Sequence, residues 1–279
     1  MASLAARLAR GDGGLYLLIL PAAIVFAAFF LVPLGQLFVI GASGKDGIAA
    51  YASIVTNRSY FQSLLSTTAL AAGVTAVTLV ISGVTGVFLS RNHFRGRAVL
   101  VAMLTFPLAF PGVVIGFMVI MLAGRQGAIG DLLEWLGGER IVFAYSMAGL
   151  FLGYVYFSIP RTLVTVMAAA EKLDPRLEEA ARSLGAGPAR VVADVIVPGL
   201  KPALLSAGAI CFATAMGAFG TAFTLATRIN VLPVTIYGVF TEQANIAAAA
   251  ALSFVLGLLT WLVLALARTA AGSTVAAAG

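Results

Sequence analysis

Six long apolar stretches constrain the fold of this chain more than any other feature of its sequence. The hydrocarbon core of a bilayer is about 30 Å thick, and a helix needs about 20 apolar residues to cross it. Inside lipid, every backbone N–H and C=O group must be hydrogen-bonded within the protein, so such stretches are expected to be helices. The sequence therefore predicts an all-α membrane protein with six transmembrane helices. The predicted spans are Leu15–Ile40, Phe61–Leu89, Ala98–Ala123, Ile141–Ala168, Ala203–Leu225 and Asn245–Ala267.

The small share of charged residues excludes a water-soluble domain. Only 10% of the residues are charged and the mean hydropathy is +1.04, whereas soluble domains carry roughly 25% charged residues. The net charge of +6 does not indicate nucleic-acid binding, because an excess of Lys and Arg in a membrane protein reflects loops that stay in the cytoplasm. We expect the lipid bilayer, and no nucleic acid, as a partner.

The distribution of Lys and Arg predicts the orientation. If the amino terminus lies inside the cell, twelve of the seventeen basic residues fall in cytoplasmic segments and five in outer loops, as the positive-inside rule requires. Arg7 and Arg10 precede a first apolar run of about 26 residues, longer than the roughly 7–15 of a cleaved signal peptide. The prediction is a multi-pass protein of a bacterial inner membrane that retains its first span and has both termini in the cytoplasm.

Side chains that carry chemistry are scarce. The predicted spans contain no Asp, Glu or Lys, and Arg161 lies in the cytoplasmic half of the fourth. Ion-coupled carriers usually hold ionisable residues near the bilayer midplane, so a secondary transporter is the weaker alternative. A membrane-bound enzyme or assembly factor would need a polar constellation that the sequence lacks. His93 and Cys211 are the sole residues of their types, and we predict no catalytic residue, no metal site and no cofactor.

Prolines and small residues mark a candidate pathway through the membrane. Pro107 and Pro111, in the sequence FPLAFPG, are predicted to bend a helix, since each removes a backbone donor. Gly112 and Gly116 have the small-xxx-small spacing that lets helices approach closely. Ordinary helix bending and loop roles remain open for all of these positions. The candidate pathway residues are Pro107, Pro111, Gly217, Gly220, Thr221 and Thr224.

A charged segment between the fourth and fifth predicted spans has the pattern of two short helices. Asp174 and Pro175 form a helix start, with a capping side chain before a proline at the first helical position. Gly185 is expected to end this helix, and Pro188 to begin a second one that stops at Pro198. The apolar face of the first helix is Leu173, Leu177, Ala180, Ala181 and Leu184.

Neither predicted helix is long enough to cross a bilayer, and an isolated helix of this length is marginal in water. Three placements are open: in the lipid headgroup plane, against the protein's own bundle, or in a groove of a partner protein. If ATP drives the protein, the partner must also supply the nucleotide site, because the sequence contains no GxxxxGK[ST] phosphate loop.

The same segment resembles the cytoplasmic signature of ABC importer permeases of the type I, binding-protein-dependent family. Residues 179–181 supply its EAA, Gly185 follows six residues after the Glu, and Pro198 closes it. Val195 and Val197 stand where the family usually has Ile and Leu, and both keep a bulky aliphatic side chain. The resemblance extends from about residue 61 to residue 267, because six spans and a signature before the penultimate span match the family's layout.

The resemblance implies a MetI-like fold with a cytoplasmic coupling helix and no catalysis by this chain. Its implied partners are two ABC ATPase subunits, a second permease subunit, either the same or a related chain, and a periplasmic substrate-binding protein. It also implies a first span in residues 1–60, a core domain in 61–268 with the coupling loop at about 170–200, and a tail in 269–279. The implied ATPase-coupling residues are Leu177, Glu179, Ala180, Ala181, Leu184, Gly185 and Pro198.

The substrate is predicted only by resemblance. The stretch from Gly217 to Ser253 looks most like the polyamine, ferric-iron and aminoethylphosphonate branch of the family. Oxyanion permeases tend to carry an acid within GEFG, whereas this chain has Ala218 in GAFG, which weakens the molybdate and sulfate interpretation. ABC exporters usually carry longer cytoplasmic helices and often a fused ATPase, so the expected direction of transport is import of a small polar solute.

Overall fold

The computed structural model describes residues 12–225 and 229–271. All regular secondary structure in these residues is helical. The predicted all-α membrane fold is confirmed. Six helical stretches are long and apolar enough to cross a membrane. They are Leu18–Ala42, Arg58–Arg91, Gly112–Trp135, Met147–Lys172, Pro188–Gly217 and Ile246–Ala270.

The centre of the bundle is formed by three long helices. Helix α5 (Arg58–Arg91) packs most extensively against α9 (Met147–Lys172), and α12 (Val197–Gly217) packs against both. Helix α15 (Ile246–Ala271) lies on the other side of α12, where it also contacts the shorter α14 (Leu232–Thr241). The largest group of buried residues lies where α5, α9 and α12 meet. Among its members are Leu70, Val74, Leu150, Tyr154, Cys211 and Met216.

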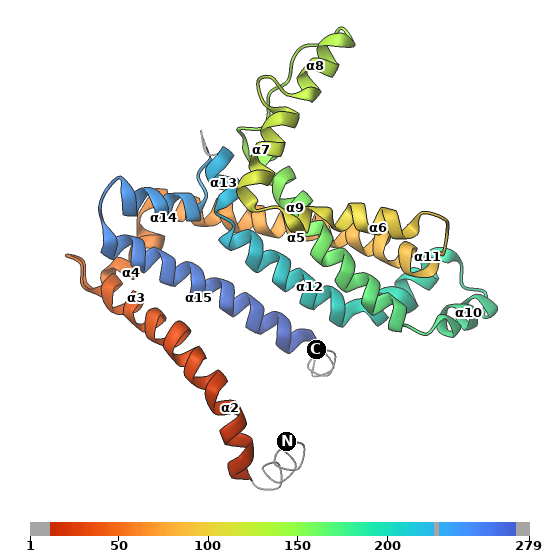
Figure 1. The fold of residues 1–279 in the computed structure, drawn as a ribbon, viewed down its shortest axis with the longest axis horizontal. Helices are drawn as coiled ribbons and strands as arrows, with labels where there is room; N and C mark the ends of the chain where they lie inside the picture. Colours follow the sequence, from red (N-terminus) through yellow and green to blue (C-terminus); the bar gives the residue numbers. More distant parts are fainter. Residues whose placement is uncertain (1–11, 226–228, 272–279) are drawn as a thin grey trace.

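The first span diverges from this bundle. Helix α2 (Asp12–Phe26) continues through a π-helical turn (Ala27–Leu31) into α3 (Val32–Ala42), and only α3 packs against α15. None of the apolar window within Leu18–Ala42 is buried, and Figure 1 shows α2 standing away from the other helices. A short helix, α4 (Ala49–Thr56), then leads into α5.

The prediction of a single third span from Ala98 to Ala123 is wrong. Helix α6 (Arg97–Thr105) ends in a 3-10 turn at Phe106–Ala109, and a new helix, α7 (Gly112–Ala123), begins after Pro111. Two prolines four residues apart remove two backbone donors, so they break the helix rather than bend it. Helices α7 and α8 (Ala128–Trp135) together form an arm that projects from the bundle in Figure 1.

The prediction for the fifth span, Ala203–Leu225, is also wrong at both ends, and Pro198 does not stop a helix. Helix α11 (Pro188–Val191) passes through a π-helical turn (Val192–Ile196) directly into α12, near whose start Pro198 lies. A proline within a continuous helix removes one backbone hydrogen bond, and the π-helical turn just before Pro198 is the local irregularity that accompanies it. At the other end, α12 stops at Gly217, and a separate short helix, α13 (Gly220–Leu225), follows.

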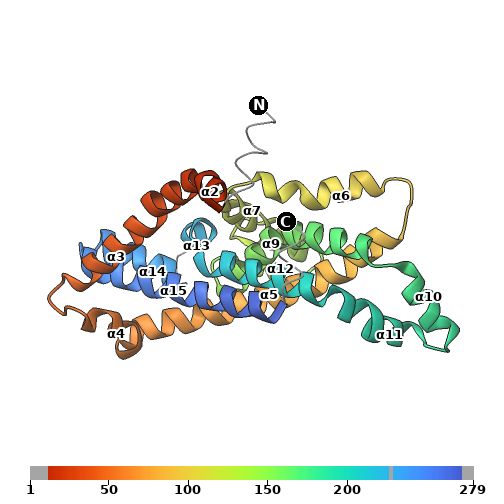
Figure 2. The ribbon, with the colours of Figure 1, turned by 90° about the horizontal axis from the view of Figure 1, so that it is seen from below.

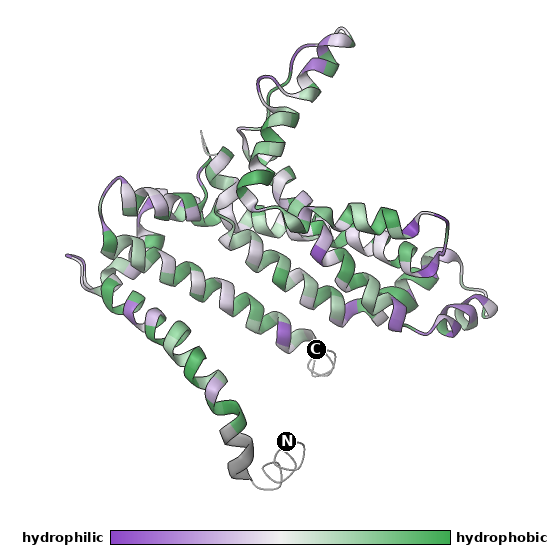
Figure 3. Cartoon of the chain, viewed as in Figure 1, coloured by the Kyte–Doolittle hydropathy of each residue, from purple (hydrophilic) through white to green (hydrophobic). Residues whose placement is uncertain are grey.

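The polar segments lie at the ends of the bundle. Helix α10 (Pro175–Ser183) and α11 occupy one end of the long axis, and the connections around α4 and α14 occupy the opposite end, as Figures 1 and 2 both show. Figure 3 shows that hydrophilic residues gather at α10 and at the tip of the α7–α8 arm. Arg7, Arg10 and Arg228, which enter the charge count for the orientation, lie outside the described residues.

Candidate functional site

The start and the end of α10 follow the predicted sequence signals. The Asp174 carboxylate accepts a hydrogen bond from the Arg176 N–H (2.9 Å), and Pro175 is the first helical residue. At the other end, Gly185 has a φ of +85°. The Gly185 N–H donates to the Arg182 carbonyl (2.9 Å) and the Ala186 N–H to the Ala181 carbonyl (3.0 Å). These two bonds form a Schellman motif, which requires a left-handed residue after the helix.

The buried acid of this segment is Glu178, which the sequence analysis did not single out. Its side chain is only 8% exposed and pairs with Arg91 at the end of α5 (2.9 Å) and with Arg182 one turn further along α10 (3.2 Å). The Glu–Arg spacing of four residues is a recognisable signal for the second contact. The first contact joins residues that are distant in sequence, and no local pattern indicates it.

Arginines from the α5–α6 corner hold the whole end of the bundle together. Arg91 also donates to the carbonyl of Leu173, the residue that caps α9 (3.0 Å). Arg97, at the start of α6, donates to the Leu89 carbonyl (2.7 Å) and pairs with Glu171 (3.3 Å). Helix α10 is therefore fixed to the ends of α5 and α9 rather than suspended from a loose loop.

The structure divides the predicted coupling residues between two faces. Ala181 packs with Ala186 against a cluster of buried residues from α9, α11 and α12, so it faces the bundle. Leu177 is 52% exposed and Leu184 is 89% exposed, and Glu179 and Ala180 are exposed beside them. Leu177 on α10 and Leu184 directly after its end are seven residues apart, and among the described residues neither has a neighbour that covers it. The buried cluster consists of Val166, Ala170, Val191, Ile196 and Leu200.

Four of the predicted pathway residues meet where α7 crosses α13. The Thr221 hydroxyl donates to the Gly112 carbonyl (2.8 Å), directly after Pro111, and Thr221 is buried. A side-chain carbon on Gly220 would lie 3.0 Å from the backbone nitrogen of Val113. Thr224 packs over Gly116: a side-chain carbon added to Gly116 would lie 2.6 Å from the Cβ of Thr224. The hydroxyl of Thr221 is committed to holding this crossing.

The other two predicted pathway residues lie apart from the crossing. Pro107 is buried in the 3-10 turn, which packs against α9. Gly217 is exposed at the end of α12, and a carbon added there would meet no atom within 4 Å. Ala218 lies between α12 and α13, and its carbonyl accepts a hydrogen bond from the Tyr154 hydroxyl. Tyr154 thus stabilises the break in the helix, a role that the sequence analysis missed.

The α7–α13 crossing gives a stability prediction. We expect Gly116→Val to lower the free energy of unfolding by about 1–3 kcal/mol, because overpacking forces neighbouring side chains and backbone to move. The measurement is thermal unfolding of the protein in detergent. Gly83→Val is the matched control, since Gly83 is also helical but has no atom within 4 Å of the added carbon. Equal losses in the two variants would contradict close packing at Gly116.

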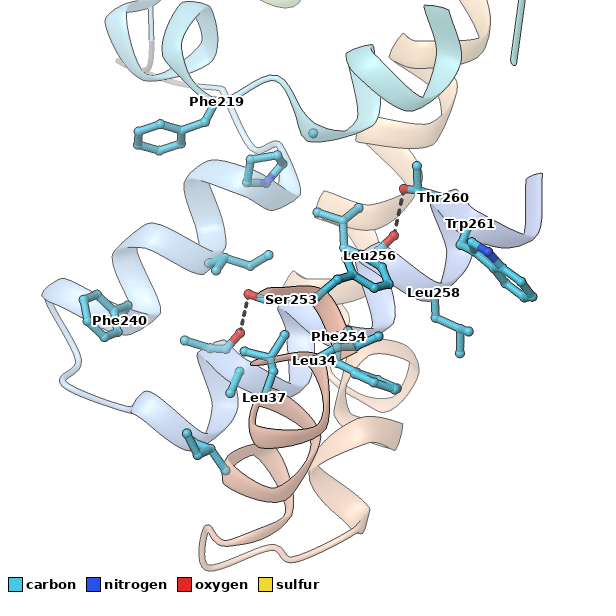
Figure 4. A pocket seen from close by; sticks show the side chains of 18 of the residues that line it. Leu34, Leu37, Phe219, Phe240, Ser253, Phe254, Leu256, Leu258, Thr260 and Trp261 are labelled. Carbon is cyan, nitrogen blue, oxygen red and sulfur yellow. Dashed lines mark hydrogen bonds between the residues drawn. The ribbon is translucent and has the colours of Figure 1, made fainter. Parts of the chain in front are cut away.

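A second feature is an apolar groove of about 1190 Å³ between the first span and the α14–α15 pair. Figure 4 shows aliphatic and aromatic side chains such as Leu34, Phe240 and Phe254 around it. The hydroxyls of Ser253 and Thr260 donate to carbonyls of their own helix (both 2.8 Å). The groove offers little to a polar solute. Within the described ranges, no cluster of three or more His, Cys, Asp or Glu residues could hold a metal.

Comparison with known proteins adds a family and a set of relatives. The family model described as "Binding-protein-dependent transport system inner membrane component" matches residues 80–271. The molybdenum transport system permease protein ModB of Escherichia coli is 37% identical over 142 residues, which are 50% of this chain and 61% of that relative. A probable molybdenum ABC transporter permease of Haloferax volcanii is 32% identical over 213 residues, or 76% of this chain and 75% of the relative.

Two further comparisons concern another solute and the fold. A putative 2-aminoethylphosphonate transport system permease protein of Salmonella typhimurium is 28% identical over 221 residues, with 77% of each chain covered. A chain in the crystal structure of a bacterial alginate ABC transporter, in complex with an alginate pentasaccharide-bound periplasmic protein, superposes with a TM-score of 0.75. That chain is 16% identical, and the match covers 91% of this chain and 92% of the other.

Proposed function

Because the chain belongs to the family of inner-membrane components of binding-protein-dependent transport systems, we propose that it forms the solute path of an ABC importer. The single observation that supports a coupling role is the exposed pair Leu177 and Leu184, on α10 and directly after it, because Arg91 and Glu178 fix this helix to the ends of the spanning helices. A rigid helix with an exposed apolar face suits docking into a groove of a partner. The proposed partner is the ATP-binding subunit.

The proposed docking explains how ATP and solute are linked. Coupling requires that ATP binding and the loaded periplasmic protein favour the same arrangement of the permease. Moving a two-state equilibrium from 1:99 to 99:1 needs about 5.5 kcal/mol of differential binding. The Arg91–Glu178 pair links α10 to α5 and to the end of α9, and Arg97 separately ties α6 to these two helices, so motion of α10 would reach three helices instead of one. We propose two ATPase subunits, a second permease subunit, and a cytoplasmic location for both α10 and the termini.

We propose an oxyanion as the solute, with molybdate and 2-aminoethylphosphonate as the candidates. Relatives named for molybdenum and for 2-aminoethylphosphonate transport support this class. The aminoethylphosphonate part of the sequence prediction agrees with these relatives, whereas polyamine and ferric iron receive no support from them. Molybdenum permeases match this chain although Ala218 replaces the acid of GEFG, so that position alone does not separate the branches.

The docking proposal predicts that Leu184→Asp weakens binding of the ATPase subunit. A charge placed on an apolar contact must be desolvated without a partner, so we expect a loss of about tenfold or more in affinity. The measurement is recovery of the ATPase subunit with the permease from detergent extracts. Leu136→Asp is the control, because Leu136 is also exposed (65%) but ends α8 on the projecting arm. Unchanged recovery with Leu184→Asp would contradict docking through α10.

A transport experiment tests the proposed function as a whole. The permease, its ATPase and its binding protein are reconstituted in vesicles, and uptake of labelled molybdate and of labelled 2-aminoethylphosphonate is measured with and without ATP. We expect ATP-dependent uptake of one of the two. Accumulation of solute by vesicles that carry the permease alone would contradict an ABC importer, because the driving force would then come from this chain.

A further inference from the structure

Arg161 is a charged residue in the middle of a membrane-spanning helix. It is the fifteenth of the 26 residues of α9, and the side chain is exposed. The sequence analysis placed it in the cytoplasmic half of a span ending at Ala168, but α9 runs to Lys172, which brings Arg161 close to the helix centre. A guanidinium at this depth is too costly to leave in contact with lipid, so such residues face protein or a water-filled cavity.

The only polar contact of the Arg161 guanidinium among the described residues is long and involves a neutral group. Its Nη1 donates to the Thr214 hydroxyl of α12 (3.3 Å), and that hydroxyl donates in turn to the Ile210 carbonyl (2.8 Å). Both residues line a small hollow of about 10 Å³, which is room for about one water molecule. Of its lining residues, four carry polar side chains. These are Ser158, Arg161, Thr162 and Thr214.

Acidic side chains that could neutralise Arg161 are engaged elsewhere or lie outside the middle of the spans. Glu171 pairs with Arg97 and Glu178 with Arg91, both at the α10 end of the bundle. Asp131 and Glu134 both pair with Arg140 on the projecting arm. Over the described parts of α5, α9, α12 and α15, no Asp or Glu lies near a helix centre. A second copy of this chain would therefore bring no carboxylate from these helices to the guanidinium.

We propose that Arg161, together with Thr214, forms an oxyanion contact on the wall of the solute path. The inference rests on the proposed function and adds a residue that recognises the solute. A guanidinium presents several donors in a plane and binds oxyanions through two parallel hydrogen bonds. A single positive charge beside neutral hydroxyls attracts an anion but binds it weakly enough to release it. Passage through the membrane requires both properties.

Uptake by the complete importer tests this proposal. We expect Arg161→Gln to reduce uptake of labelled molybdate or 2-aminoethylphosphonate by about tenfold or more, because the neutral amide lacks the positive charge and the two parallel donors of the guanidinium. Stimulation of ATP hydrolysis by the loaded binding protein should persist, since α10 and its arginines are untouched. Arg161→Lys keeps the positive charge but not the planar pair of guanidinium donors, and we expect it to retain about a third of the uptake. Arg268→Gln, which removes an exposed arginine in the last turn of α15, is the control.

The outcomes separate this inference from the proposed function. Uptake by the unaltered importer together with normal uptake by Arg161→Gln overturns the role of Arg161 and leaves the importer intact. Failure of the unaltered importer to transport either oxyanion overturns both the solute class and the inference. Equal losses with Arg161→Gln and Arg161→Lys, accompanied by loss of stimulated ATP hydrolysis, would show a structural role and overturn the contact.

Water access provides a second readout that needs no transport. Cys211 is the only cysteine of the chain and is buried, so a Cys211→Ala background carries no other thiol. We expect Arg161→Cys in that background to react with charged methanethiosulfonate reagents in the assembled importer. Absence of any reaction, with and without ATP, would place residue 161 against lipid or packed protein and overturn the proposal.

Discussion

Glu178→Ala is expected to uncouple the proposed importer while the permease still inserts and folds. Removing one partner of a buried ion pair leaves the other charge uncompensated, which costs about 3–5 kcal/mol when burial is complete. Because Arg91 keeps 20% of its side chain exposed, solvent screens its charge, and we expect the loss of Glu178 to cost about 2–3 kcal/mol of stability. That energy holds α10 against the ends of α5 and α9. We expect uptake and recovery of the ATPase subunit to fall by about tenfold or more.

The control for this experiment is Glu171→Ala at the same end of the molecule. Glu171 also pairs with an arginine, but its side chain is 55% exposed, and exposed ion pairs contribute only about 0–1 kcal/mol. The two variants remove the same chemical group and differ in burial. Similar uptake in both variants would contradict a positioning role for Glu178. A Glu178→Ala and Arg91→Ala double variant measures how much of the loss belongs to the pair.

The second large effect is expected from Gly185→Val. Gly185 has a φ of +85°, and a β-branched residue is rarely found in that region. Strain of about 1–3 kcal/mol would fall on the turn between α10 and α11, and relief of that strain would break the two Schellman hydrogen bonds. Helix α10 would then change its angle to the spanning helices. We expect loss of ATPase recovery and of uptake with normal amounts of protein in the membrane.

Gly187→Val is a matched control for the Gly185 variant. Both glycines are exposed, and a carbon added to either meets no atom within 4 Å. Gly187 has a φ of −71°, which valine adopts without strain. A difference between the two variants therefore reports the left-handed backbone and not the volume of the new side chain. Retention of uptake by Gly185→Val would show that the angle of α10 is unimportant for coupling.

The candidate site shows which parts of the molecule local sequence signals can predict. The cap at Asp174, the proline at the first position of α10 and the glycine after its end were all predicted correctly, because each acts within one turn of its own backbone. The resemblance of residues 179–198 to a family signature was sufficient to predict the fold and the family. By contrast, the sequence analysis drew attention to Glu179, which is exposed, and passed over its buried neighbour Glu178.

The errors in the predicted spans have a common cause. Hydropathy measures how apolar a stretch is, but it does not show where helices are packed closely enough to stabilise a break. The turn at Phe106–Ala109 packs against α9, and the Ala218 carbonyl at the second break is satisfied by Tyr154 from another helix. Pro198, expected to end a helix, lies instead near the start of α12, after a π-helical turn.

The sequence by itself determined that this chain is a helical membrane protein, where α10 begins and ends, and where α11 begins. All of these follow from rules that act locally: backbone groups in lipid must be hydrogen-bonded within the segment, and helix ends need capping. Only the tertiary structure decided that Glu178 meets Arg91, that α7 crosses α13, and that Arg161 stays exposed beside Thr214. These arrangements depend on side chains that are distant in the chain, whose pairing is set by the packing of whole helices.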